Sequence, residues 1–287
     1  MPMTNAEIRG HYEMHWSKQS VEAESLEHLR YSDPVEDDAM YRAYDRAIRD
    51  LAPAAIGGRI LDIGSGSGRW VRLFLERYRP SRLFGVDIAS ASVALLERWI
   101  MSDESAGLRG DSACEFRQGN IGLAAFELGE RFDLINAANV LFHIPETELF
   151  LGALVKIRDH LAPGGRAFIT EYLPHGDKRT EWMQIRGRYT YRAALERCGL
   201  RLVDIRAGSF FGSDPFGVEG PDGGARTTLF SVQSMRREFR AKLRDPQLRE
   251  GFGRLMVEME RAALGFCEDK IAPIDLPGQK LIIVERA

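Results

Sequence analysis

The sequence is poor in cysteine, in long apolar runs and in excess charge. It holds three cysteines among 287 residues and no Cys-x-x-Cys pair, which excludes a disulfide framework and a zinc cluster of cysteines. No run of about eighteen apolar residues occurs, so we expect no membrane-spanning segment. The first residues lack the apolar core of a signal peptide, and we expect a cytoplasmic protein. The formal net charge of −3 provides no global attraction to nucleic acid or to an anionic membrane.

A glycine-rich turn follows a short apolar run near residue 60. Residues 60–68 read Ile-Leu-Asp-Ile-Gly-Ser-Gly-Ser-Gly, with glycines at 64, 66 and 68. A buried strand that ends in a glycine turn and opens a helix is the entry to a nucleotide-type site in an α/β sheet. The glycines permit positive φ and let the backbone come close to a ligand.

The next apolar stretch indicates which ligand the turn accepts. Residues 83–86 end on Asp87, whose carboxylate is placed to accept hydrogen bonds from both hydroxyls of a ribose. The dinucleotide fingerprint Gly-x-Gly-x-x-Gly/Ala is not met, because Arg69 or Val71 stands at its third position. A pyrophosphate needs the close helix approach that a small residue permits there. The pattern therefore favours an adenosine ligand without phosphates.

These residues resemble the class I S-adenosylmethionine-dependent methyltransferases. Residues 62–68 are similar to the first motif of that family, and Val86-Asp87 to the second. The resemblance implies S-adenosylmethionine as cofactor and S-adenosylhomocysteine as product. It assigns to the cofactor, from its amino-acid part to its ribose and adenine, Asp62, Gly64, Ser65, Gly66, Asp87 and Ile88.

Strand and helix patterns alternate through the middle of the chain. This alternation predicts βαβ units and a doubly wound, Rossmann-like, mainly parallel sheet. We expect strands near 59–64, 83–87, 114–118, 132–138, 165–172, 200–207 and 279–285, and helices near 67–78, 90–101, 146–161 and 188–198. The family has seven strands, the last antiparallel beside the sixth, and residues 279–285 read as that strand. Residues 161–165 (Leu-Ala-Pro-Gly-Gly) are similar to its turn before strand five.

Two segments fall outside this alternation and divide the chain. Residues 1–56 are helical in pattern and predict an N-terminal lid, while residues 57–207 and 278–287 predict the cofactor-binding core. Residues 208–277 stand where the family has a short hairpin. Long loops of this kind are usually functional or disordered, and we expect a lid or substrate cap. Its basic residues, interleaved with acidic ones, indicate either a solvated helix face or a docking surface for an anionic partner: Arg236, Arg237, Arg240, Lys242, Arg244, Arg249 and Arg254.

Polar residues follow the third and fourth predicted strands. Asn120 either accepts a hydrogen bond from the adenine amino group through its side-chain oxygen or is a plain turn residue. Its neighbour Ile121 is also predicted to bind the cofactor. The resemblance puts the backbone of Ala138 and Asn139 at the methionine part of the cofactor. His143 comes next on a short helical turn. It is either a general base that takes a proton from a hydroxyl or a structural residue.

Aromatic residues crowd the predicted N-terminal helix. Residues 11–16 (His-Tyr-Glu-Met-His-Trp) resemble the aromatic helix that closes over the cofactor in many small-molecule methyltransferases, which makes Tyr12 and Trp16 cofactor residues. Aromatic faces also suit a sulfonium cation. The alternative is an amphipathic helix that buries its aromatics. Glu171 and Tyr172 end the fifth strand and face either the substrate side or the core.

The prediction is methyl transfer from S-adenosylmethionine to an oxygen or nitrogen of a small molecule, such as a natural product or a sugar-type metabolite. One alternative is an RNA methyltransferase that uses the basic insertion; another is an NAD-dependent oxidoreductase, which the glycine spacing disfavours. Residues 136–139 lack the Asn/Asp-Pro-Pro motif of the commonest DNA enzymes. No metal-ligand spacing stands out, so we expect no metal. We expect neither a membrane nor a nucleic acid as partner, and a homodimer through the insertion is left open.

Overall fold

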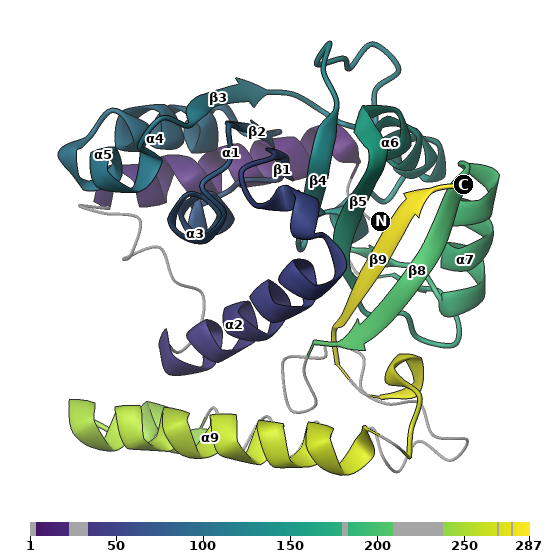
Figure 1. Ribbon diagram of the computed structural model, residues 1–287. Helices are drawn as coiled ribbons and strands as arrows, with labels where there is room; N and C mark the ends of the chain where they lie inside the picture. Colours follow the sequence, from purple (N-terminus) through teal and green to yellow (C-terminus); the bar gives the residue numbers. More distant parts are fainter. Residues whose placement is uncertain (1–3, 23–33, 180–182, 209–237, 269, 277) are drawn as a thin grey trace.

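A seven-stranded sheet forms the centre of the protein (Figure 1). The structure is a computed structural model, and it describes residues 4–22, 34–179, 183–208, 238–268, 270–276 and 278–287. The strand order across the sheet is β3-β2-β1-β4-β5-β9-β8. The strands are β1 Arg59–Ile63, β2 Arg82–Asp87, β3 Ala113–Gln118, β4 Phe132–Ala137, β5 Leu161–Glu171, β8 Leu200–Ala207 and β9 Lys280–Arg286.

Strand direction confirms the predicted fold class. The pairs β1–β2, β1–β4, β2–β3 and β4–β5 are all parallel. Strand β9 lies between β5 and β8 and is antiparallel to both. The last strand of the chain is therefore antiparallel beside the sixth, as the resemblance implies, and it lies between two strands that precede it.

Helices and short elements connect these strands. The helices are α1 Asn5–Glu22, α2 Pro34–Leu51, α3 Arg69–Tyr78, α4 Ser90–Ile100, α5 Asp103–Arg109, α6 Thr147–His160, α7 Arg188–Arg197 and α9 Pro246–Cys267. Short 3₁₀ turns are η2 Pro53–Ala55, η3 Leu141–His143 and η4 Pro273–Asp275, and a small hairpin joins β6 Lys178–Arg179 to β7 Gln184–Ile185. Helix α3 begins two residues later than predicted, because Gly68 is its N-cap in the left-handed region at φ 77°.

Both faces of the sheet are buried under helices. Ile60 and Leu134 belong to the core under α3 and α4, whereas their neighbours Leu61 and Ile135 belong to the core under α6 and α7. Successive residues of a strand point to opposite faces, so a strand covered on both sides needs a continuous apolar run. This explains why residues 60–63 are apolar apart from one carboxyl.

The expected turn at residues 161–165 is part of strand β5. Phe132 pairs with Leu161 and Leu134 pairs with Arg166, so residues 162–165 bulge out of the ladder. Gly164 takes a positive φ of 76° there. The Pro-Gly-Gly sequence therefore interrupts a strand that has already begun, and the prediction of a turn before the strand was wrong.

Helices α1, α2 and α9 lie at the edge of the sheet where the parallel strands end. Helix α1 packs there against α4, and α9 packs against α2 (Figure 1). Residues 238–242 and α9 form the described helical part of the predicted insertion. The loop expected from Gly208 to Gly224 lies outside the described residues except for Gly208, as do Arg236 and Arg237.

Candidate active site

A cavity of about 1700 Å³ opens at the carboxyl ends of β1, β2 and β4. Helices α1, α2 and α9 contribute its other walls, as does the end of β8. This is the edge at which open α/β sheets bind ligands. The structure brings almost all predicted site residues to this one cavity: Tyr12, Trp16, Gly64, Ser65, Gly66, Asp87, Ile88, Asn120, Ile121, Ala138, Asn139 and His143.

The glycine loop has the backbone that its sequence predicts. Gly64 and Gly66 have φ of 69° and 48°. A Cβ on Gly64 would lie 2.3 Å from Cγ2 of Val140, and one on Gly66 would lie 3.0 Å from Cζ2 of Trp16. Both positions therefore need glycine for its conformation and for the space that it leaves.

The Asp87 carboxylate organises this loop. Its Oδ2 accepts a hydrogen bond from the Gly66 amide at 2.8 Å, and its Oδ1 accepts one from the Ala89 amide at 2.9 Å. Burial raises the pKa of Asp87, and these amide bonds oppose that effect. Each carboxylate oxygen has a second lone pair, so Asp87 can hold the loop and also accept a ribose hydroxyl.

Asp62 is the one predicted cofactor residue outside the cavity lining. It is buried below the loop, where Nδ2 of Asn136 donates to its Oδ1 at 2.8 Å. Burial raises the pKa of Asp62 to about 7, because the charged form loses its hydration, and the Asn136 bond opposes this. Within the described part of the chain its Oδ2 has no hydrogen-bond partner.

The turn after β3 ties down the predicted adenine residue. Oδ1 of Asn120 accepts a hydrogen bond from the Gly122 amide at 2.9 Å. Asn120 is thus a turn residue, and its amide group still lines the cavity beside the buried Ile121. The oxygen predicted to accept a hydrogen bond from the adenine amino group therefore already accepts one within the turn. A contact of its second lone pair with adenine stays a prediction.

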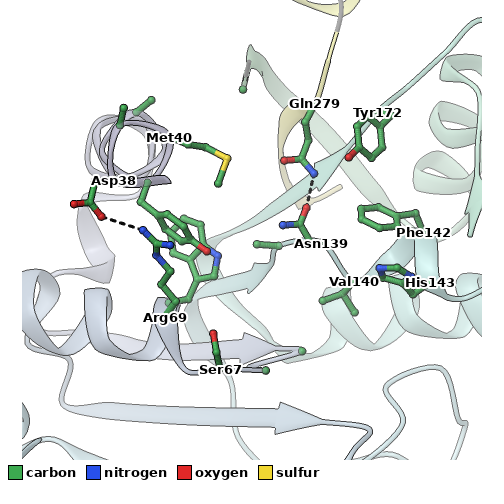
Figure 2. A pocket seen from close by; sticks show the side chains of 18 of the residues that line it. Asp38, Met40, Ser67, Arg69, Asn139, Val140, Phe142, His143, Tyr172 and Gln279 are labelled. Carbon is green, nitrogen blue, oxygen red and sulfur yellow. Dashed lines mark hydrogen bonds and ion pairs between the residues drawn. The ribbon is translucent and has the colours of Figure 1, made fainter. Parts of the chain in front are cut away.

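Asn139 is the centre of a polar chain that the sequence did not reveal. Its backbone has a φ of 60°, and its amide donates to Oγ1 of Thr170 at 2.7 Å. Its Oδ1 accepts hydrogen bonds from Thr170 and from Nε2 of Gln279 (Figure 2). Tyr44 of α2 donates to Oε1 of Gln279 at 3.1 Å. Asn139 thereby links the end of β4 to α2 and to the residue before β9.

Helix α1 reaches the candidate base. The Tyr12 hydroxyl lies 3.1 Å from Nδ1 and 3.0 Å from Nε2 of His143, and the two rings meet edge to face at 5.3 Å. One turn further, Trp16 is buried against Gly66. The two aromatic residues expected at the cofactor therefore contact its glycine loop and the candidate catalytic residue.

Glu13 fixes helix α1 in this position. Its carboxylate accepts hydrogen bonds from the amide and the hydroxyl of Ser90, at 2.7 and 2.6 Å, and from the Ala91 amide at 3.2 Å. The N-cap residue of α4 is Ala89, whose side chain makes no capping hydrogen bond. Glu13 thus supplies the cap from another helix, where a negative charge is also favourable to the helix dipole.

Arg69 connects helix α2 to the same loop. Its guanidinium pairs with Asp38 at 3.0 Å (Figure 2). It also lies over the ring of Tyr41, 4.0 Å from the ring centroid. Arg69, which is too large for the third position of the dinucleotide fingerprint, therefore attaches α2 to the glycine loop. Across the cavity from it lie Phe142 and Tyr172 (Figure 2).

Some of the remaining predicted residues line the cavity, and the others lie outside its lining. Tyr172 lines the cavity, whereas Glu171 is buried outside its lining. Among the basic residues of the insertion, Arg240 and Arg254 line the cavity, and Arg254 pairs with Glu250 at 2.5 Å. Three others are exposed outside the cavity lining: Lys242, Arg244 and Arg249.

The described residues contain neither a metal-binding cluster nor a membrane-spanning helix. No group of three or more His, Cys, Asp or Glu side chains there is arranged to hold a metal ion. No described helix combines the length and the apolar character that crossing a bilayer requires.

Comparison with known proteins identifies the family. The methyltransferase-domain family matches residues 37–204, which is more than half of the chain. The chain belongs to this family. It is of the class I, S-adenosylmethionine-dependent type that the glycine loop and Asp87 predict.

Individual relatives match over a part of their length. The ubiquinone biosynthesis O-methyltransferase of Nitrobacter winogradskyi is 32% identical over 128 residues, which cover 45% of this chain and 43% of that protein. The erythromycin 3''-O-methyltransferase of Saccharopolyspora erythraea is 27% identical over 128 residues, or 44% and 39% of the two chains. This methyltransferase chain thus spans less than half the length of these curated relatives.

Solved structures support the fold. The CcbJ methyltransferase of Streptomyces caelestis has a TM-score of 0.51 with this chain at 14% identity, and the match covers 87% of this chain and 90% of that one. At this identity the likeness shows a shared fold alone. The likeness therefore supports the Rossmann-like fold of the seven-stranded sheet.

Proposed function

We propose that this methyltransferase transfers a methyl group from S-adenosylmethionine to an oxygen, or a nitrogen, of a small molecule. The observation that carries the proposal is the cavity, whose lining includes the glycine loop, Asp87 and His143. Its volume of about 1700 Å³ exceeds the roughly 300–1,000 Å³ of a single-ligand pocket. It therefore has room for an acceptor beside the cofactor.

The residues present fit S-adenosylmethionine. Gly64 and Gly66 leave a cradle that a Cβ would fill, and Asp87 lines the cavity with lone pairs to spare for a ribose. Trp16 and Tyr12 place aromatic surface beside that loop, which suits a cation. When bound, S-adenosylmethionine supplies a methyl group that is already electrophilic, because it is attached to a sulfonium.

The chain's own task is then to orient the acceptor, exclude water and move one proton. Helices α1, α2 and α9 enclose the cavity and hold a bound acceptor near His143, and such orientation can replace a large part of an activation barrier. His143 in its neutral form accepts the proton of an acceptor hydroxyl at a ring nitrogen. An amine acceptor with a free lone pair has no such need, so the histidine base favours an oxygen acceptor.

The outer parts of the chain belong to the proposal as well. Residues 1–56 act as a lid through α1 and α2, and residues 208–277 act as a cap through α9, because all three helices line the cavity. We also propose catalysis without a metal ion, in which His143 alone takes the proton of the acceptor. The sparse cysteines, all three free, support a cytoplasmic location. A homodimer through the insertion is also proposed, and the outer face of α9 supports it.

An RNA substrate is the weaker candidate. Helix α9 carries three arginines and three glutamates, so it has no net positive charge with which to hold a phosphate backbone. The relatives named above are an O-methyltransferase of ubiquinone biosynthesis and one of erythromycin. Both names support a small-molecule acceptor.

The first experiment is a calorimetric titration of the protein with S-adenosylmethionine. We expect micromolar binding by the wild type and near-complete loss in Asp87→Ala. Asp111→Asn is the matched control, because Asp111 is an exposed carboxylate just before β3, outside the cavity lining. Hydroxylated small molecules are then screened by mass spectrometry for a methyl gain. A folded wild type that does not bind S-adenosylmethionine would contradict the proposal.

A further inference from the structure

Helix α9 turns an apolar stripe away from the protein. Leu248, Leu255, Met259 and Phe266 are 62%, 54%, 42% and 68% exposed. Phe252 is half-buried and contacts the exposed Phe239, with ring centroids 5.1 Å apart. Large exposed side chains gathered on one helix mark an interaction surface more often than scattered ones do.

The spacing of these residues is that of a coiled-coil seam. Apolar residues follow one another at steps of four, three, four, three and four. This alternation is the a/d pattern by which two helices pack side by side. We name this set the α9 seam: Leu248, Phe252, Leu255, Met259, Ala262 and Phe266.

The opposite side of α9 already has its partners. Gly253 and Cys267 are buried, and Val257 and Leu264 line the cavity. The α9 seam is therefore not the face that attaches this helix to the rest of the chain. In Figure 1, α9 lies at the outer boundary of the described structure, below α2.

The α9 seam is complementary to itself when two copies run antiparallel. A two-fold axis beside residue 257 would set Leu248 of one copy against Phe266 of the other, and Leu255 against Met259. The same axis sets the large Phe252 against the small Ala262. Each a position then meets a d position over about 27 Å of helix, at a rise of about 1.5 Å per residue. A two-fold interface repeats the same patch on both subunits, as this symmetry requires.

The charges beside the seam permit such a pairing. No charged residue lies in the seam, and α9 as a whole carries three arginines and three glutamates. Glu258, which comes nearest the two-fold axis, is paired within its own chain to Arg261 at 2.8 Å. Two copies therefore bring no net like charge together.

The glycine content of α9 makes it weak as an isolated helix, so contacts of the α9 seam would stabilise it. It contains Gly251, Gly253 and Gly265, and glycine is less favourable than alanine inside a helix. A helix with such residues depends on tertiary contacts more than on its own propensity. Burial of the α9 seam against a second copy supplies them.

We propose that the α9 seam is a homodimer interface, formed by antiparallel pairing with the same helix of a second copy. The pairing would hold α9 in place as a wall of the cavity. The proposal is independent of methyl transfer, because the seam and the cavity lie on different sides of α9.

The first test measures the molar mass in solution. Sedimentation equilibrium of the wild type should give twice the monomer mass at micromolar concentration. The double variant Leu255→Glu/Met259→Glu should be monomeric and should still bind S-adenosylmethionine, which shows that it is folded. Met101→Glu is the matched control, since Met101 is 80% exposed elsewhere, and it should remain dimeric. A monomeric wild type, whose seam is then covered by its own chain or by another partner, overturns the proposal, as does a double variant that stays dimeric.

The second test determines the direction of the helices. Two differently tagged chains, Leu255→Cys and Met259→Cys, are co-expressed and oxidised with diamide. Antiparallel pairing should give a disulfide between the two tags, with wild-type chains as the control for the native cysteines. A dimer in which only Leu255→Cys chains cross-link to one another overturns the antiparallel arrangement, and so does a dimer without the mixed disulfide.

Discussion

The hydroxyl of Tyr12 lies 3.0 Å from Nε2 of His143, so a residue of helix α1 contacts the imidazole predicted to be the base. The two residues are 131 positions apart in the chain. This contact links α1, the proposed lid, to the proposed base. The imidazole is held by a hydroxyl that α1 supplies.

Replacement of His143 tests its proposed role directly. With a hydroxyl acceptor, His143→Ala should lower kcat by about 10²–10⁴-fold, since this is the usual contribution of a positioned base. Tyr12→Phe removes only one hydrogen bond, worth about 1 kcal/mol, and should lower kcat by about 5-fold. Steady-state kinetics over a range of pH measures both.

The control for these variants is His175→Ala, because His175 is exposed and lies outside the cavity lining. It should leave kcat unchanged. All three variants should bind S-adenosylmethionine in calorimetry. If His143→Ala lost only severalfold in kcat, His143 would be a structural residue and the base would lie elsewhere.

Glu13 provides a test of the lid. Its three hydrogen bonds to the start of α4 hold α1, which carries Tyr12 and Trp16. Glu13→Ala removes a helix cap worth about 1 kcal/mol and frees α1, so we expect S-adenosylmethionine to bind about 5- to 10-fold more weakly. Calorimetry measures the affinity, and hydrogen exchange of α1 should increase.

Arg9→Ala is the matched control for Glu13→Ala. Arg9 is exposed on the same helix, so its removal should change neither the affinity nor the exchange. Equal affinities of Glu13→Ala and wild type would mean that α1 does not contribute to the cofactor site.

Local spacing explains why the fold and the glycine loop could be predicted. A strand, a turn and a helix within twenty residues leave their pattern in consecutive positions, as residues 60–68 do. The partners of Asn139 leave no such pattern, because Gln279 follows 140 positions later and Thr170 follows 31 positions later. Glu13 and Ser90 are likewise 77 positions apart. These contacts arise from the folded sheet and have no local signature.

The bulge in β5 shows a different limit of sequence reasoning. Pro163 and Gly164 have the composition of a turn, and composition alone does not show whether a turn precedes a strand or interrupts it. The pairing of Leu161 with Phe132 decides this, and it depends on a strand about thirty residues earlier. Asp62 also lies elsewhere than its motif predicts. The motif predicts a cofactor residue, but the pleat of β1 directs the Asp62 side chain to the buried Asn136.

The glycine loop should be intolerant of a single methyl group. Gly64→Ala forces alanine to a φ of 69° and places its Cβ against Val140, so we expect a loss of about 2 kcal/mol or more in unfolding free energy. Gly107→Ala is the control, because Gly107 lies in α5 with no atom within 4 Å of an added Cβ. It should stabilise by about 0.5–1 kcal/mol. Urea unfolding measures both, and equal effects would contradict the strained loop.

Glu171 should make the stability of the protein fall as pH rises. Burial raises the pKa of Glu171 to about 8, and the nearby charge of Arg186 opposes this. An unfolded glutamate has a pKa of about 4.3, so between these values the folded state holds a proton that the unfolded state has lost. The contribution of Glu171 to the unfolding free energy is therefore greatest below about pH 4 and declines as the pH rises to about 8.

Glu171→Gln should remove this contribution, because glutamine does not titrate. The unfolding free energy of the variant, measured by urea titration from pH 5 to pH 9, should decline less steeply than that of the wild type. A part of the slope should remain, since Asp62 also has a raised pKa. Glu196→Gln, on the exposed side of α7, should keep the full wild-type slope. An unchanged slope in Glu171→Gln would mean that Glu171 keeps its charge in the folded protein, with Arg186 as the neighbouring cation that stabilises it.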